Sequence, residues 1–301
     1  MCKLAIFPYL TAKTNKKAKI FAKLLGNIYV ETEQDGFGYA AVDVEDRLFG
    51  ERWLEPHLIF KKFKSSVPEN WKDFSIEGNS YEKFGEGELS QQVKSLMIHA
   101  RLATSEVAIY NVHPFIDDGT ALIHNGVINK KGMKLKTSTC DSEGALNEYN
   151  ESVVGSFPEQ AQDFISTLSG WFALGIYAKS LDKSYILDVI KDASASLYII
   201  RLDKEFDVFV TSLEDARRAA RRGGMKITSH AQVISNIFMR FNINTGEIIV
   251  LDKFNTKRVF GYENYISEWQ KTATHPWTEN EDDDMKDILL DTKNERIKYG
   301  L

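Results

Sequence analysis

Short apolar runs separated by polar turns extend along most of the chain. Residues 3–7 alternate weakly between apolar and other side chains and predict a strand at the start. Later β-rich runs predict further strands at 28–30, 39–44, 96–98, 121–123, 171–177, 184–190, 196–202, 206–211, 232–242 and 247–252. We expect the first two of these to pair around the turn Asp35-Gly-Phe-Gly38. The order is strand-rich, which does not by itself specify an architecture.

A helical spacing of apolar positions replaces this pattern in a few segments. The predicted helices are one that begins at Thr14 or Asn15 and ends at Gly26, one over 158–168 capped by Ser156, and one over Leu213–Arg222 that ends at Gly223-Gly224. Residues 46–90 show neither pattern, so we make no prediction for them. They contain aromatic residues, lysines and glycines in no regular order.

The composition narrows the class of protein. The chain has 301 residues, of which 43% are hydrophobic and 27% are charged, which is typical of a globular protein in water. The formal net charge of -5 argues against a general nucleic-acid binder. No apolar run approaches the roughly 20 residues that span a bilayer, so no membrane segment is expected. The two cysteines, Cys2 and Cys140, predict no disulfide framework and favour a cytoplasmic location.

Polar residues follow two of the apolar runs at their carboxyl ends. Arg101 comes after the run at 96–98, Asn125-Gly126 comes after the next, and Asp141 follows a polar turn. This set suits a bound amino acid. Arg101 can grip an α-carboxylate with both prongs of its guanidinium, and Asp141 can accept from the α-ammonium. Asn125 and Gly126 can donate to a carbonyl oxygen.

Each of these residues also has a purely structural interpretation. Arg101 can be a surface arginine at the end of a strand, and Asn125-Gly126 can be an ordinary β-turn. Asp141 and Glu143 can face the positive end of a helix that begins there. The two roles of Asp141 are compatible if that helix starts beside the pocket, and Glu143 is interpreted as structural.

A nucleophile is available at position two. Removal of Met1 would leave Cys2 with a free α-amine beside its own thiol. That amine has an ordinary pKa of about 7.7–8.0, so near neutral pH it can accept the thiol proton directly or through water. The alternative is a frayed terminus with an incidental cysteine. Cys140 is a second candidate, but no base is evident beside it, and a buried free thiol is the simpler interpretation.

Three histidines, His99, His113 and His124, lie in the same part of the sequence and could suggest a metal site. Their flanks are strand-like, and neither the H-x-x-x-H nor the C-x-x-C spacing occurs. We therefore expect hydrogen bonding that orients the pocket and no metal ion.

Several of these motifs occur together in an order typical of one family. They are Met1-Cys2, Asp35-Gly-Phe-Gly38, His99-Ala-Arg-Leu-Ala-Thr104, His113-Pro114, His124-Asn-Gly126, Asp141-Ser-Glu143 and Gly170-Trp-Phe-Ala-Leu174. The chain resembles the glutaminase domain of class II glutamine amidotransferases, the N-terminal-nucleophile (Ntn) hydrolase type found in glucosamine-6-phosphate synthase and amidophosphoribosyltransferase. The resemblance extends over about residues 2–252 and implies an α+β fold, a four-layer αββα sandwich of two antiparallel sheets between helix layers.

The resemblance also implies an activity. Cys2 would attack the side-chain amide of glutamine and form a thioester, with release of ammonia and then glutamate, and no cofactor would be needed. The implied catalytic residues are Cys2, Asn125 and Gly126, and the implied substrate-binding residues are Arg101, Thr104, His113 and Asp141. Lys3 departs from the family, which usually has a small glycine after the nucleophile.

Two further expectations concern domains and partners. Residues 2–254 are expected to form the amidotransferase domain, and 255–301 an appendage that is first aromatic and then acidic. The nitrogen acceptor, if there is one, is expected to be handled by a synthase on a separate chain. Two other functions stay open, namely an Ntn amidase that acts on another γ-glutamyl-type amide and a non-catalytic amino-acid-binding module.

Overall fold

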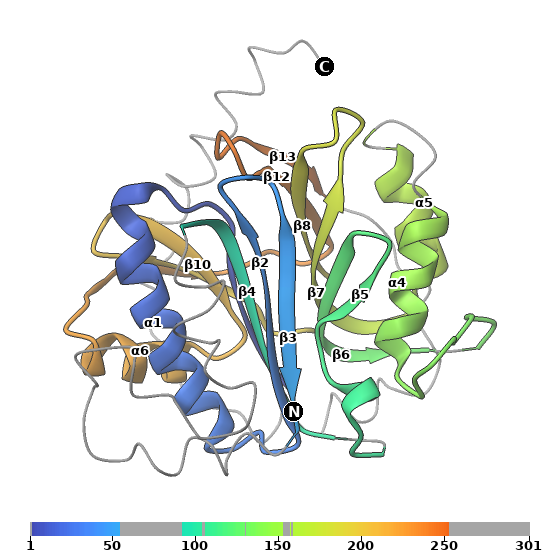
Figure 1. The fold of residues 1–301 in the computed structure, drawn as a ribbon, viewed down its shortest axis with the longest axis horizontal. Helices are drawn as coiled ribbons and strands as arrows, with labels where there is room; N and C mark the ends of the chain where they lie inside the picture. The colour runs from blue at the N-terminus through green and yellow to red at the C-terminus, as the bar shows by residue number, and fades with distance from the viewer. Residues whose placement is uncertain are drawn as a thin grey trace.

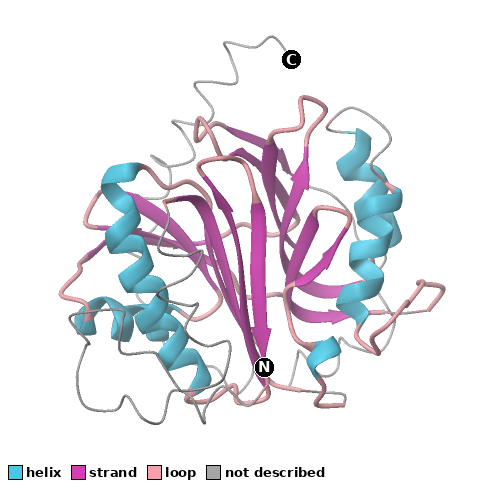
Figure 2. Ribbon diagram, in the orientation of Figure 1, coloured by secondary structure: helices cyan, strands magenta, loops and turns pink. Residues whose placement is uncertain are grey.

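Two antiparallel sheets lie face to face between helices (Figure 1). The computed structural model describes residues 2–54, 92–103, 106–129, 131–152, 157 and 159–252. Helices α1 (Ala12–Val30) and α6 (Leu213–Arg222) lie on one side of the strands, and α4 (Asp141–Glu151) and α5 (Glu159–Thr167) lie on the other (Figures 1 and 2). This four-layer αββα arrangement confirms the predicted fold class.

The first sheet holds the start of the chain near its centre. Its strand order is β11-β9-β10-β1-β4-β2-β3, and every neighbouring pair is antiparallel. The strands are β1 (Lys3–Phe7), β2 (Gly36–Asp43), β3 (Leu48–Trp53), β4 (Val93–Arg101), β9 (Tyr198–Leu202), β10 (Phe206–Val210) and β11 (Ile227–Gln232). Because β1 lies between β4 and β10, its first residues are held from both sides.

The second sheet carries the Asn125-Gly126 segment. Its strand order is β13-β12-β8-β7-β6-β5, again antiparallel throughout. The strands are β5 (Phe115–Asp117), β6 (Thr120–Ile128), β7 (Gly170–Lys179), β8 (Tyr185–Lys191), β12 (Ile237–Asn242) and β13 (Ile248–Asp252). A short 3₁₀ helix, η5 (Ile109–Asn111), precedes β5.

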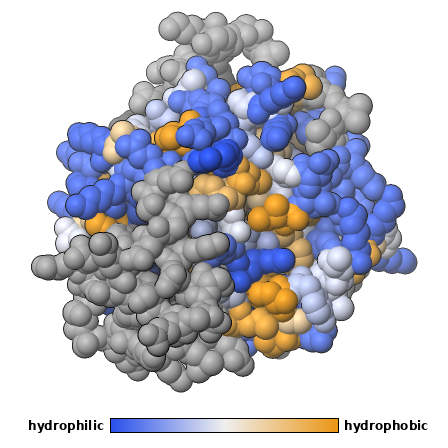
Figure 3. All heavy atoms as spheres, in the orientation of Figure 1, coloured by the Kyte–Doolittle hydropathy of each residue, from blue (hydrophilic) through white to orange (hydrophobic). Residues whose placement is uncertain are grey.

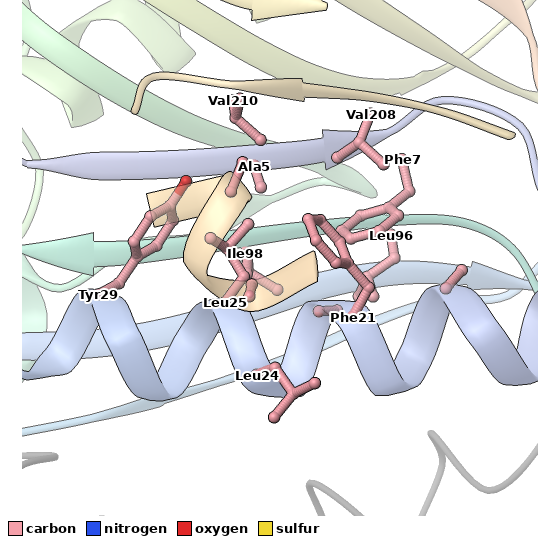
Figure 4. Packing of buried hydrophobic residues seen from close by; sticks show 14 of the residues in the cluster. Ala5, Phe7, Phe21, Leu24, Leu25, Tyr29, Leu96, Ile98, Val208 and Val210 are labelled. Atoms are coloured by element: carbon pink, nitrogen blue, oxygen red, sulfur yellow. The ribbon is translucent and has the colours of Figure 1, made fainter. Parts of the chain in front are cut away.

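Side-chain alternation along the strands produces three apolar layers. On β1, Ala5 and Phe7 pack beneath α1 and α6 (Figure 4), whereas Leu4 and Ile6 pack between the two sheets. A third layer joins the second sheet to α4 and α5 and includes Phe164. The outer surface over these two helices is hydrophilic (Figure 3), as expected for amphipathic helices. Each fully buried large side chain stabilises the fold by about 1.5–3 kcal/mol.

The first helix is longer than predicted at both ends. Thr11 is its N-cap and forms a reciprocal capping box with Thr14. The helix continues through Gly26 and includes residues 28–30, so the predicted strand at 28–30 is wrong. A Cβ at Gly26 would lie only 3.1 Å from Phe37 Cζ, so glycine permits close packing against β2. Ile28 and its neighbours are buried there, which offsets the cost of about 1 kcal/mol for a helical glycine.

Other expectations had mixed outcomes. Helix Leu213–Arg222 is confirmed, with Ser212 as its cap, and α5 confirms most of the helix predicted over 158–168. Of the strand predicted over 232–242, Ile237–Asn242 forms β12, and Gln232 is the last residue of β11. Asp35-Gly-Phe-Gly38 is not a turn, because β2 begins at Gly36. The proposed cap Ser156 and the appendage at 255–301 lie outside the described residues.

The described helices include none that is both long enough and apolar enough to cross a membrane.

Candidate active site

Cys2 lies at the amino end of β1, on the side of the strand that faces the second sheet. Leu4 and Ile6 belong to the inter-sheet layer, and Cys2 has the same parity. Its Sγ donates to the carbonyl oxygen of Leu102 at 3.6 Å. Burial raises the pKa of the Cys2 thiol, and the Glu33 charge adds to this, although the hydrogen bond to Leu102 and the charge of Arg101 act in the opposite direction. The thiol therefore needs a base to react near neutral pH.

Arg101 ends β4 beside Cys2. Lys3 pairs with Ala100 and Leu4 with His99, so the register continues to place Cys2 opposite Arg101. Only 3% of Arg101 is exposed, which excludes the interpretation as a surface arginine. Its Nη2 donates to the carbonyl oxygen of Glu106 at 3.1 Å. A cation buried at the end of a strand, one strand from a thiol, can bind a carboxylate there.

Asn125 and Gly126 lie within β6 and do not form a turn, so the β-turn interpretation is wrong. Asn125 pairs with Ala173, which belongs to the inter-sheet layer, so Asn125 faces the same layer as Cys2. It is 1% exposed, and its Oδ1 has no hydrogen-bond partner among the described residues. A buried amide oxygen without a partner costs about 1–3 kcal/mol, which a bound ligand could recover.

Gly126 has a backbone conformation that excludes other residues. Its φ is 141°, and a Cβ there would lie 2.1 Å from the carbonyl oxygen of Trp171 on the neighbouring strand β7. Glycine is therefore required at this position for the two strands to pair as they do.

A hydrogen bond between the sheets joins the two strands that carry these residues. His99 Nε2, from β4, donates to the carbonyl oxygen of His124 at 2.8 Å. That carbonyl belongs to the peptide bond that precedes Asn125. Because His99 pairs with Leu4 of β1, this one bond connects the strand that follows Cys2 to the strand of Asn125.

The three histidines form a buried cluster. The ring centroids of His99 and His113 are 4.0 Å apart, and those of His113 and His124 are 6.4 Å apart. Burial lowers the pKa of His99 to about 3 and also lowers the pKa values of His113 and His124, so all three are neutral at pH 7. A neutral His99 that donates through Nε2 must carry its proton there. Within the described residues, no group of histidine, cysteine or carboxylate side chains is arranged to hold a metal ion.

Asp141 is the first residue of α4 and contacts β6. Its Oδ2 accepts from the backbone N–H of Ile128 at 2.7 Å, and its Oδ1 lies 3.8 Å from His124 Nδ1. A loop links this position to Arg101, because the Glu106 carbonyl that Arg101 binds also accepts from Asn111 Nδ2 at 3.0 Å. The same amide contacts Thr139, two residues before Asp141. Residues 106–111 thus connect Arg101 to the segment just before Asp141. No described contact joins Asp141 to Cys2.

Two neighbours of Asp141 have structural roles. The Glu143 carboxylate accepts from the backbone and side chains of Thr137 and Ser138, and from the backbone of Lys136, and so holds the loop before α4. Cys140 is the N-cap of α4, and burial together with the Asp141 charge raises its pKa to about 11. A thiol with that pKa is a poor nucleophile near pH 7.

Comparison with solved structures identifies the fold that holds these residues. The chain is similar to glutamine phosphoribosylpyrophosphate amidotransferase from B. subtilis in complex with ADP and GMP, with a TM-score of 0.56 and 17% identity over 85% of this chain and 50% of that chain. A structure described as the allosteric regulatory enzyme of purine biosynthesis gives the same values. This chain has the fold of a class II glutamine amidotransferase.

The other comparisons set limits on that result. A glutamine aminotransferase class-II domain protein from Silicibacter pomeroyi is less similar, with a TM-score of 0.47 and 10% identity over 85% of this chain and 100% of that one. No protein-family model and no curated protein sequence matches the chain. Because the chain spans about half the length of the two enzymes above, the likeness concerns the amidotransferase fold and not the whole enzymes.

Within this amidotransferase fold, two residues of the Asp35-Gly-Phe-Gly38 motif support the site through contacts that the sequence did not predict. A Cβ at Gly38 would lie 2.1 Å from the carbonyl oxygen of His113, so only glycine lets that segment cross β2. Asp35, just before β2, accepts from the backbone N–H of Ala103 at 2.7 Å, and its own N–H donates to the carbonyl of Arg101 at 3.1 Å. These bonds hold the segment whose Leu102 carbonyl contacts the thiol.

The remaining predicted site residues have different outcomes. His113 is 3% exposed, and neither of its ring nitrogens has a hydrogen-bond partner among the described residues. Its ring packs against the ring of His99, which makes the inter-sheet bond. Thr104 lies outside the described residues. The structure therefore places Cys2 opposite Arg101 and connects their strands, through His99, to the strand of Asn125. The substrate contacts of His113 and Thr104 remain predictions.

Proposed function

We propose that this chain is a glutaminase of the class II amidotransferase type, with Cys2 as its nucleophile. The observation that carries the proposal is the convergence of three groups at one end of the inter-sheet layer. A thiol lies opposite a buried arginine, and the inter-sheet bond of His99 connects their strands to the strand that carries the buried Asn125. The fold found among class II amidotransferases agrees with this assignment.

The proposed reaction begins with a proton transfer inside Cys2. The α-amine of the mature residue takes the thiol proton, and the thiolate attacks the side-chain carbonyl carbon of glutamine. The oxyanion accepts hydrogen bonds from the Asn125 side-chain amide and the Gly126 backbone N–H. The C–N bond breaks as the amine returns its proton to the leaving ammonia. Water then hydrolyses the γ-glutamyl thioester, which releases glutamate and restores the thiol, and the cycle needs no metal or cofactor.

Recognition of the substrate is assigned to charged groups around the thiol. Arg101 would bind the α-carboxylate of glutamine in a bidentate manner, and Asp141 would bind its α-ammonium. His113 and Thr104 are proposed as further substrate contacts. We also propose that the ammonia passes to an acceptor synthase on a separate chain, and that the aromatic part of 255–301 docks on this domain or on that partner.

Covalent labelling tests the proposal. A diazo-ketone analogue of glutamine should add to Cys2, and mass spectrometry of the intact protein and of its peptides should locate the adduct there, on a chain that lacks Met1. Cys2→Ala should abolish both labelling and glutaminase activity. Cys140→Ser is the matched control and should keep both. Labelling at Cys140, or full activity with a blocked amino terminus, would overturn the mechanism.

Replacement of Arg101, together with Cys2→Ala, separates the two other functions. An amidase whose substrate lacks a free α-carboxylate would keep its activity when Arg101 is replaced. A binding module without catalysis would show no glutamine hydrolysis, and its affinity for glutamine would persist in Cys2→Ala.

A further inference from the structure

Lys3, the residue next to the nucleophile, makes an unusually complete set of contacts for a lysine at the start of a strand. Its Nζ lies 2.7 Å from Asp215 Oδ2 and 3.7 Å from Glu33 Oε1, and it donates to Thr32 Oγ1 at 2.9 Å. It also lies 5.7 Å from the centre of the Tyr29 ring. The Lys3 side chain is only 18% exposed, so solvent screens these interactions less than those of a surface pair.

These contacts come from the helix side of the first sheet, opposite the thiol. Lys3 shares its parity with Ala5, which packs beneath α1 and α6, whereas Cys2 faces the second sheet. Asp215 belongs to the first turn of α6, and Glu33 follows the carboxyl end of α1. The Lys3 side chain thus ties the first residue of β1 to the ends of two helices.

The backbone beyond Lys3 is held at the same place. The N–H of Leu4 donates to Thr211 Oγ1 at 3.0 Å, and the carbonyl of Leu4 accepts from the Tyr29 hydroxyl at 3.1 Å. Cys2 itself has one described hydrogen bond, the weak thiol contact with Leu102. Lys3 is therefore the first firmly held residue after Cys2, and its contacts limit where Cys2 can lie.

The charges around this anchor act on the nucleophile. The carboxylates are Glu33 and Asp215, and the cations are Lys3, Arg101 and Arg218, whose Nη1 lies 3.5 Å from Asp215 Oδ1. The Glu33 charge raises the pKa of the Cys2 thiol, and the Arg101 charge lowers it. Without Lys3, the negative charges of Glu33 and Asp215 would be less fully compensated.

We propose that Lys3 is a positioning residue for Cys2, which anchors the start of β1 and neutralises the carboxylates of Glu33 and Asp215 on the helix side of the first sheet. The inference rests on the proposed function, because it assigns a role in the reactivity of Cys2. An uncompensated carboxylate favours the protonated α-amine, which cannot accept the thiol proton, and it disfavours the thiolate.

The test compares Lys3→Met, Lys3→Arg and Glu33→Gln in a Cys140→Ser background, where Cys2 is the only thiol. Lys3→Met should lower kcat for glutamine about tenfold and leave KM within about twofold, because nucleophile alignment is lost and the substrate contacts are kept. The acid limb of the kcat/KM profile should move up by roughly half a pH unit or more. Lys3→Arg should retain most of the wild-type rate, since the charge is kept.

Glu33→Gln tests the direction of the shift in the acid limb. It removes a carboxylate, so the acid limb should move to lower pH, opposite to the shift in Lys3→Met. The rate at which iodoacetamide alkylates Cys2 should show the same opposite shifts, and this measurement needs no glutaminase activity. The two failures are therefore distinguishable. If the proposed function is wrong, the wild-type protein does not hydrolyse glutamine. If only the role of Lys3 is wrong, the alkylation rates do not shift.

The control is Lys17→Met, which removes another lysine of the helix side, paired with Asp203 and Glu205. It should change neither the rate nor the pH profile. The inference is overturned if Lys3→Met keeps the wild-type kcat and profile, or if Glu33→Gln shifts the profile upward or not at all. Should Lys3→Met fail to fold, Lys3→Gln takes its place, with the same expected fall in kcat and the same upward shift of the acid limb.

Discussion

Two clusters of buried polar side chains lie on opposite faces of the second sheet, and they differ in how completely they are paired. Under α4, Asp188 accepts from Arg240 Nε at 2.8 Å, from Arg240 Nη2 at 2.7 Å and from the Tyr149 hydroxyl at 2.6 Å. Between the sheets, Asn125 Oδ1, His99 Nδ1 and both ring nitrogens of His113 have no partner among the described residues. Asp188, Tyr149, Asn125, His99 and His113 are each at most 3% exposed, and the Arg240 side chain is 11% exposed.

The difference indicates what each cluster does. A fully satisfied ion pair with a hydroxyl partner holds a helix on a sheet, and any partner lost there exposes an unpaired charge to a low dielectric. Polar atoms left unsatisfied reduce stability, so their presence beside a thiol and a buried arginine is better explained by a ligand that completes them. The first cluster is expected to control folding, and the second is expected to control turnover.

The largest expected effect is on stability, at the satisfied cluster. Asp188→Ala leaves Arg240 buried with no carboxylate and should lower the free energy of unfolding by about 3–5 kcal/mol, measured by urea denaturation. Replacement of all three members, as Tyr149→Phe, Asp188→Leu and Arg240→Met together, should be closer to wild type than the single variant. Turnover per folded molecule should change little. A large loss of turnover in folded Asp188→Ala would erase the distinction between the clusters.

The next effect is on turnover, at the unsatisfied cluster. Asn125→Ala should lower kcat by roughly 10²–10³, equivalent to about 2.7–4 kcal/mol, because it removes one oxyanion donor. KM and the free energy of unfolding should stay close to wild type. Asn147→Ala is a matched control, since Asn147 is also buried but donates to the carbonyl of Lys134 at 2.7 Å. That variant should lose stability and keep kcat, and the reverse pattern would contradict the comparison.

A smaller effect is the loss of stability at acid pH. His99 has a pKa of about 3 in the folded protein because it is buried, against about 6.5 when unfolded. Between these values the unfolded chain binds the extra proton, so stability is complete above pH 6.5 and falls as the pH drops. From pH 6.5 to pH 5, which lies above the ordinary carboxylate range, His99 alone should cost about 2 kcal/mol of unfolding free energy. His99→Asn should show a shallower dependence, and an unchanged slope would count against a buried neutral imidazole.

The smallest effect is on substrate affinity. Arg101→Lys keeps the positive charge but loses the two-pronged geometry, so KM for glutamine should rise about tenfold, or about 1.4 kcal/mol, with little change in kcat. Arg201→Lys is the matched control, because Arg201 forms a fork with Asp207 on the surface of the first sheet. It should leave KM unchanged. If Arg101→Lys and Asn125→Ala gave the same kinetic pattern, the division between binding and chemistry would be wrong.

Much of the fold could be predicted from local sequence. The alternation on residues 3–7 predicted the central strand, and the helix at Leu213–Arg222 was predicted with its end at Gly223. The clustered motifs also indicated the residues that the structure brings together at Cys2, Arg101 and Asn125. These features depend on short-range periodicity, on caps, and on residue types whose chemistry is intrinsic.

Other features were decided only by contacts between distant segments. Residues 28–30 are β-branched and aromatic, yet they are helical because their burial against the first sheet outweighs local preference. Asn125-Gly126 forms a strand because β7 pairs with it, although the dipeptide alone favours a turn. His99 meets the His124 carbonyl, and Lys3 meets Asp215, only after two sheets stack and two helices dock. Such pairs are 25 and 212 positions apart in sequence, and local pattern carries no information about which distant group a side chain will reach.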